Sequence, residues 1–202
     1  GLGIVVLFVA LFPQLGVGAK HLFKSEVPGP ITEGLRPKIK ETAMALWWIY
    51  VAITALEALL LWFAGLSVFE ALLHAMSTMA TGGFSTRATS IASFDSPLVE
   101  WIIILFMYLA GVNFALHYAA LGGRFNVFVH NGEWRVYTVA LVGCSLVITA
   151  LLLPEMSGDL ETALRKASFQ VLALGTGTGF GTADYDTWPV LAKVILMGLM
   201  IM

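Results

Sequence analysis

The chain has 202 residues, of which 58% are hydrophobic and only 12% charged, and its mean hydropathy is +0.86. Soluble domains carry roughly 25% charged residues, so this composition excludes an ordinary soluble protein and predicts an integral membrane protein within a lipid bilayer. The single Cys144 lies inside an apolar run, which excludes a disulfide framework and a cysteine metal site. We expect no nucleic-acid partner.

Apolar runs predict the membrane segments. A crossing helix needs roughly 17 to 25 mainly apolar residues, and four runs approach or reach that length: Gly1 to Val17, Ala43 to Gly65, Leu98 to Leu121 and Val136 to Leu153. A fifth run, Pro189 to Met202, is cut short. Two others are too short to cross and are predicted to be half-membrane, re-entrant helices: Val68 to Ala80 and Leu160 to Leu174. Because the chain starts at Gly1 and stops inside an apolar run, we expect a fragment of a longer protein.

Basic residues in short loops predict the orientation, because Lys and Arg collect on the cytoplasmic side. The loop after the first span and the loop after the third hold most of them: Lys20, Lys24, Arg36, Lys38, Lys40, Arg124 and Arg135. The opposite side carries most of the acids: Glu70, Asp95, Glu100, Glu155, Asp159, Glu161, Asp184 and Asp186. This asymmetry predicts an acidic outer vestibule that concentrates cations. The alternative for each acid alone is a solvated face that keeps a loop out of lipid.

Each short helix ends in a glycine-rich segment, and the two segments form an internal repeat. Thr81-Gly82-Gly83-Phe84 aligns with Gly177-Thr178-Gly179-Phe180, at an offset of 179 − 83 = 96 residues. Both copies follow a full span and a short helix, and both precede an aromatic and Asp turn and a proline that opens the next span. The predicted unit is therefore span, short helix, glycine segment, span.

A dehydrated cation in a bilayer needs oxygen ligands, and successive backbone carbonyls supply them if several point at one axis. Glycine accepts positive φ without a Cβ clash, so it permits that geometry. Capping signals predict where each short helix starts, because Ser67 and Glu70 have capping-box spacing and Asp159 and Glu161 lie at the start of the second helix. The alternative is that these glycines serve close packing of helices.

The stretches "HAMSTMATGGFSTRATSIASFDSP", "GVNFALHYAAL" and "FQVLALGTGTGFGTADYDTWP" resemble the second and third repeats of the Trk/Ktr/HKT potassium transporter family, most closely its bacterial TrkH branch. The resemblance implies an all-α membrane protein with four span, pore-helix, filter and span units around one pseudo-fourfold axis. In such a chain, residues 1–19 close a preceding repeat, 20–42 form a cytoplasmic linker, 43–121 and 136–202 are pore repeats, and 122–135 is a cytoplasmic loop.

The resemblance also implies the site and its partners. Potassium, the substrate rather than a cofactor, would bind the backbone carbonyls of Thr81, Gly82, Gly83, Gly177, Thr178 and Gly179, while Phe84 and Phe180 would wedge behind the filter. Family members are homodimers that bind a cytosolic nucleotide-binding regulatory subunit of the TrkA or KtrA type. The implied location is the bacterial inner membrane, with the filter opening to the outside. The family's gating loop would lie beyond Met202.

Several alternatives stay open at this stage. The protein could permit or couple sodium, or it could be a non-conducting membrane subunit. An enzyme is not expected, because no hydrolase elbow, zinc-protease pair or phosphate-binding loop occurs in the sequence. Glu57 should face protein, because a charge at membrane depth costs at least ~2.5 kcal/mol. Arg87 either tunes cation access or pairs with Asp95. His74, Asn113 and His117 serve helix packing or, alternatively, a proton path.

Overall fold

The structure, a computed structural model, describes residues 36–124, 126–154, 156 and 158–200. The predicted span at 1–17 and the first part of the predicted linker at 20–42 lie outside these residues, whereas residues 36–42 of that linker belong to a helix that continues into the next predicted span. The chain divides into two compact units, Gly1–Ala52 and Ile53–Met202, and the boundary falls inside helix α3 (Arg36–Phe63). In the first unit, the rings of Trp47 and Trp48 meet edge to face at 4.9 Å.

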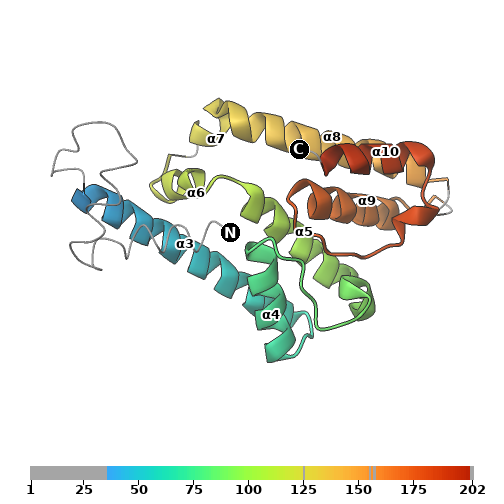
Figure 1. The fold of residues 1–202 in the computed structure, drawn as a ribbon, viewed down its shortest axis with the longest axis horizontal. Helices are drawn as coiled ribbons and strands as arrows, with labels where there is room; N and C mark the ends of the chain where they lie inside the picture. Colours follow the sequence, from blue (N-terminus) through green and yellow to red (C-terminus); the bar gives the residue numbers. More distant parts are fainter. Residues whose placement is uncertain (1–35, 125, 155, 157, 201–202) are drawn as a thin grey trace, which may run out of the picture. The chain divides into compact units, whose positions relative to one another are not determined.

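The described residues form helices joined by short loops (Figure 1). After α3 these helices are α4 (Val68–Met79), α5 (Pro97–Gly111), α6 (Phe114–Leu121), α7 (Asn126–His130), α8 (Gly132–Leu152), α9 (Leu160–Gly175) and α10 (Val190–Leu199). Two 3-10 turns, Ser90–Phe94 and Tyr185–Thr187, precede Pro97 and Pro189. The predicted all-α fold is confirmed, and a proline opens the helix after each turn as expected.

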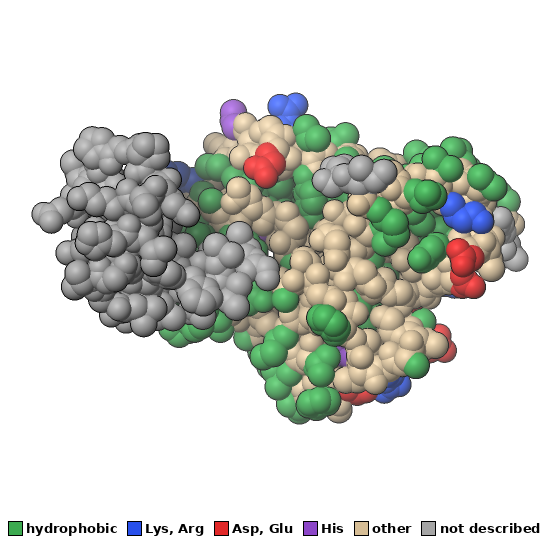
Figure 2. Space-filling model, in the orientation of Figure 1, with side chains coloured by type: hydrophobic (Ala, Val, Ile, Leu, Met, Phe, Trp, Pro, Cys, Tyr) green, Lys and Arg blue, Asp and Glu red, His purple; other side chains and the backbone are tan. Residues whose placement is uncertain are grey.

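Among the described residues, two helices can cross a membrane by length and composition, or three segments if the bent pair α5 and α6 counts as one span. Among the described residues, Met44–Phe63 and Gly132–Leu152 are long and apolar enough to cross, and they match two of the predicted spans. The predicted span from Leu98 to Leu121 is instead two helices, α5 and α6, which meet at an angle of 97°. Apolar side chains form several patches on the visible face, and charged side chains lie in a few small groups (Figure 2).

The break between α5 and α6 satisfies its own backbone groups. Asn113 caps α6 by accepting a hydrogen bond from the Ala115 amide at 3.0 Å. His117 bonds to the carbonyl oxygen of Leu109 at 3.0 Å, in the last turn of α5. A helix end inside protein needs such partners for its free amides and carbonyls. Asn113 and His117 therefore satisfy backbone groups at the bend.

The core of the second unit lies where α5, α8, α9 and α10 pack together, with α4 against α5. Helices α8, α9 and α10 run side by side in Figure 1. The largest fully buried apolar side chains in this core include Ile103, Met107, Ile148 and Phe169. This packing fixes α4 and α9, the two short helices that precede the glycine segments.

Candidate functional site

The first glycine segment, residues 81–84, follows directly from helix α4. The predicted capping box starts this helix: the Ser67 hydroxyl accepts from the Glu70 amide at 3.2 Å, and the Glu70 carboxylate accepts from the Ser67 amide at 3.4 Å. At the other end, the Ser77 carbonyl accepts from the Gly82 amide at 2.8 Å, and the Ser77 hydroxyl accepts from the Phe84 amide at 2.6 Å. Ser77 therefore holds the segment against the helix end.

The second glycine segment, residues 177–180, follows helix α9 in the same manner. Asp159 caps α9 by accepting from the amides of Glu161 and Thr162, as predicted. The carbonyl of Ala173 accepts from the Gly179 amide at 2.8 Å. Ala173 lies 173 − 77 = 96 residues after Ser77, which is the offset of the internal repeat. Equivalent helix positions thus anchor both segments.

The backbone alternates in the same register in both segments. Thr81 and Gly83 have φ of 50° and 66°, and their equivalents Gly177 and Gly179 have φ of 72° and 80°. The residues between them, Gly82 and Thr178, do not have positive φ. Alternation between right-handed and left-handed residues turns successive carbonyls toward one side of the chain, which a run of ordinary L-residues resists.

Thr81 is the strained member of this pattern. A left-handed conformation costs a residue with a Cβ roughly 1–2 kcal/mol, and such outliers gather at functional sites. Its hydroxyl donates to the carbonyl oxygen of Ala80 at 2.8 Å, which ties the side chain to its own backbone.

The two segments meet although they lie far apart in the sequence. In Figure 1 the C-terminal ends of α4 and α9 approach the same region beside α5. A Cβ added to Gly83 would overlap the carbonyl oxygen of Thr178 and lie 3.1 Å from its carbonyl carbon. Just beyond the segments, the Ala92 amide donates to the carbonyl oxygen of Gly181 at 3.2 Å. The structure therefore places Gly83 of the first segment against Thr178 and Gly179 of the second.

The two phenylalanines of the repeat differ. Phe180 is 2% exposed and its ring lies 6.1 Å from that of His74 on α4. Phe84 is 75% exposed, which departs from the expectation that both rings wedge behind the segments. The difference arises because Phe180 packs against α4, the short helix of the other copy of the repeat. The described part of the chain supplies no equivalent helix to cover Phe84.

Glu57 faces protein, as predicted. Glu57 lies on α3, is fully buried, and interacts with Thr78 of α4. Neither carboxyl oxygen has a hydrogen-bond partner with good geometry among the described residues, and the Thr78 hydroxyl donates to the carbonyl of His74 at 2.8 Å.

The charged residues near the segments form pairs that the sequence did not predict. Arg87 binds Glu70 at 2.9 Å and not Asp95, and its guanidinium lies 4.2 Å from the centre of the Phe94 ring. Arg165 binds Glu100 at 2.5 Å and Glu161 at 2.9 Å, and Arg165 and Glu100 are both buried. Glu100 is therefore a partner in a buried ion pair and not part of a solvated acidic face.

The Glu70 pair predicts a pH dependence. Hydrogen bonds from Arg87 and then from Ser67 hold the pKa of Glu70 below its usual range. A lowered folded-state pKa stabilises the protein above the unfolded value of roughly 4.3, and this contribution is lost as the pH falls through the lowered pKa. Between about pH 3 and 6, we expect the unfolding temperature of Glu70→Gln to depend less on pH than that of the unmodified protein. Arg87→Gln should weaken this pH dependence in the same way. If the pH dependence is unchanged in both variants, the ion pair is not the cause of the lowered pKa of Glu70.

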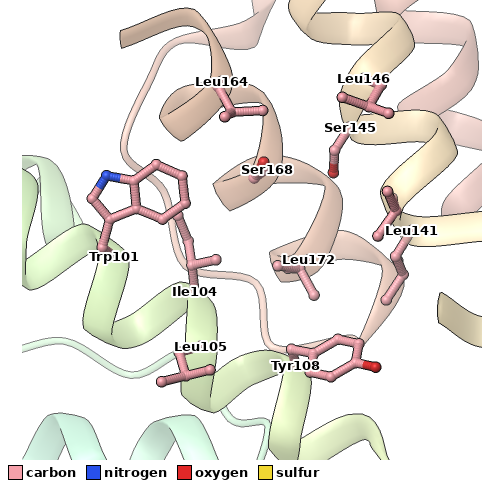
Figure 3. Close-up of a pocket in the computed structure, with 11 residues that line it drawn as sticks. Trp101, Ile104, Leu105, Tyr108, Leu141, Ser145, Leu146, Leu164, Ser168 and Leu172 are labelled. Atoms are coloured by element: carbon pink, nitrogen blue, oxygen red, sulfur yellow. The ribbon is translucent and has the colours of Figure 1, made fainter. Parts of the chain in front are cut away.

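A groove elsewhere in the second unit is a less suitable site. It lies between α5, α8 and α9, with Trp101 and Tyr108 supplied by α5 and with Ser145 and Ser168 facing it (Figure 3). Its lining is otherwise apolar: Ile104, Leu105, Leu141, Val142, Leu146, Leu164 and Leu172. It includes no residue of either glycine segment, and within the described ranges no three His, Cys, Asp or Glu side chains gather to hold a metal.

Comparison with known proteins assigns the family. Residues 1–202 match the family TrkH, described as a cation transport protein. The potassium uptake protein TrkH of Salmonella typhimurium is 40% identical over 98% of this chain and 41% of its own length, and TrkG of Escherichia coli is 32% identical over 98% and 41%. The crystal structure of the potassium transporter TrkH from Vibrio parahaemolyticus matches with a TM-score of 0.77 and 31% identity, over 96% of this chain and 40% of that one. The chain spans about two-fifths of the length of these relatives.

The chain therefore belongs to the TrkH family of cation transport proteins.

Proposed function

We propose that the full-length protein takes up potassium across the plasma membrane, and that the two glycine segments are two of its four filter strands. The observation that carries this proposal is the alternating φ at equivalent positions of two segments that lie against each other. Carbonyls aligned in this way replace the hydration shell of a potassium ion. The proposed ligands are the carbonyl oxygens of Thr81, Gly82, Gly83, Gly177, Thr178 and Gly179.

The helices before the segments favour a cation. The C-terminal end of a helix carries about half a unit of negative charge, and α4 and α9 both end directly before a glycine segment. Non-helical backbone at membrane depth is stable only where protein buries it or where it lines a watery cavity. A pore lined by these segments meets both conditions.

The architecture follows from the repeat. We propose that residues 43–121 and 136–202 are two pore units, arranged with two further units around one axis. Each filter phenylalanine would then pack on the pore helix of a neighbouring unit, as Phe180 does on α4. The exposed Phe84 would pack in the same manner on a unit that these residues do not include.

The finer assignments rest on the family. We propose a homodimer in the bacterial inner membrane, with the glycine segments opening outward and a nucleotide-binding regulatory subunit of the TrkA or KtrA type on the cytosolic side. The names of the relatives, potassium uptake proteins and a potassium transporter, support potassium as the substrate. Sodium permeation or coupling and a non-conducting subunit are the alternatives.

Ion flux through the full-length protein in liposomes tests the proposal. We expect potassium flux to exceed sodium flux, and we expect Gly179→Ser to lower the ratio because a Cβ disfavours φ of 80° at that residue. Equal fluxes of the two ions would favour sodium permeation. Absence of any flux in a folded protein would favour a non-conducting subunit, and a ratio unaffected by Gly179→Ser would remove this residue from the filter.

A further inference from the structure

We propose that His74 and Gln170 are equivalent positioning residues, each of which tethers the backbone beyond a glycine segment to the helix before it. This inference rests on the proposed function, in which the segments are filter strands. Hydrogen bonds to the ends of α4 and α9 hold the start of each segment. The tethers hold the far side, so that each segment is fixed at both ends.

The bonds of His74 specify its tautomer. His74 is fully buried on α4, and its Nδ1 lies 2.7 Å from the carbonyl oxygen of Glu70, which can only accept. Nδ1 therefore carries the proton, and in the neutral ring Nε2 is an acceptor. The Oγ of Ser85 lies 2.9 Å from Nε2, so Ser85 donates its hydroxyl proton to His74. Ser85 directly follows Phe84, the last residue of the first glycine segment.

The loop completes this arrangement. The Ser85 oxygen accepts a hydrogen bond from the Arg87 amide at 3.2 Å, so the hydroxyl both donates and accepts. The imidazole lies edge to face with the ring of Phe94 at 5.2 Å, and the ring of Phe180 lies 6.1 Å away. His74 therefore links α4 to its own loop and contacts the second glycine segment.

Gln170 occupies the equivalent position in the second copy of the repeat, on helix α9. It lies 170 − 74 = 96 residues after His74, at the offset that relates Gly83 to Gly179. Its side chain is 1% exposed, and its Nε2 donates to the carbonyl oxygen of Ala183 at 3.2 Å. The residue types differ and the acceptor lies two residues further along the loop, but the bond again runs from the helix across to the chain beyond the segment.

A buried polar side chain that only satisfied itself would bond back to its own helix. His74 does bond back to α4 through Nδ1, but its Nε2 and the Nε2 of Gln170 both face the loop. Because a buried polar group is costly without a partner, each tether opposes movement of the loop away from its helix. Loss of a tether should therefore loosen the carbonyls of the segment and reduce discrimination between ions more than it reduces conduction.

The test measures potassium and sodium flux through the full-length protein in liposomes, together with its unfolding temperature. We expect His74→Leu and Ser85→Ala to lower the potassium-to-sodium ratio by a larger factor than they lower potassium flux. We expect His74→Gln to retain most of the ratio, because glutamine is the residue at the equivalent position and can accept from Ser85. Met76→Leu, at an exposed position of α4, is the matched control.

The outcomes separate this inference from the proposed function. If Gly83→Ser lowers the ratio while His74→Leu and Ser85→Ala do not, the tether is overturned and the filter stands. If none of the three changes the ratio, the filter assignment fails and the tether fails with it. If the ratio falls only in step with unfolding temperature in every variant, including His74→Gln, the role is merely structural and the proposal is overturned. Should His74→Leu fail to fold, Ser85→Ala decides, because it removes the same bond and leaves the buried ring in place.

Discussion

Gly83→Ala is expected to abolish selective potassium flux, with a far larger effect than Gly179→Ala. At both positions a Cβ disfavours the left-handed backbone by roughly 1–2 kcal/mol. At Gly83 the added carbon also overlaps the carbonyl oxygen of Thr178. At Gly179, apart from its two chain neighbours, no described residue lies within 4 Å of the added carbon. The overlap forces the two glycine segments apart, and overpacking of this kind adds typically 1–3 kcal/mol.

The measurement is the potassium-to-sodium flux ratio of both variants of the full-length protein, at matched amounts of folded protein in liposomes. We expect a partial fall for Gly179→Ala and a loss of selective flux for Gly83→Ala. Equal effects would mean that the contact between the segments does not contribute to selectivity. The reverse order would contradict the arrangement of the two segments described above.

Arg165→Met is expected to destabilise the protein by about 3–5 kcal/mol, because it leaves the buried carboxylate of Glu100 without its partner. This ion pair joins α5 to α9. The second partner of Arg165, Glu161, has a side chain that is 52% exposed. Glu161→Gln should therefore change stability by less than about 1 kcal/mol.

The double variant Arg165→Met with Glu100→Leu is the control. It removes both charges, and apolar replacements of a buried pair are often close to neutral. We expect it to recover most of the loss in unfolding temperature of the detergent-solubilised protein. A double variant as unstable as Arg165→Met alone would show that Arg165 acts through packing and not through the carboxylate of Glu100.

Local signals made the two short helices predictable. Ser67 and Asp159 are caps whose side chains act within one turn, so the starts of α4 and α9 can be inferred from sequence alone. Their ends were predictable because glycines follow them, and the observed helices end at Met79 and Gly175, within a residue of the predicted ends. The equivalence of the two glycine segments was likewise visible as a repeat.

The bend between α5 and α6 could not be predicted in the same way. The apolar run continues through Gly111 and Val112, so its composition favours one span. A Cβ on Gly111 would overlap the hydroxyl of Tyr137, so α8 packs closely against the break. Contacts from a later helix therefore accompany a bend that the run itself does not specify.

The membrane character, the repeat, the helix caps and the turns at glycine could all be predicted from the sequence, because each depends on composition or on residues within a few positions. The pairing of Arg165 with Glu100 and the contact of Gly83 with Thr178 became visible only in the folded chain. The burial of Phe180 and the exposure of Phe84 did so too. These features join residues from different units of the repeat. Their energies depend on which surfaces meet after the helices pack, and a local pattern does not contain that information.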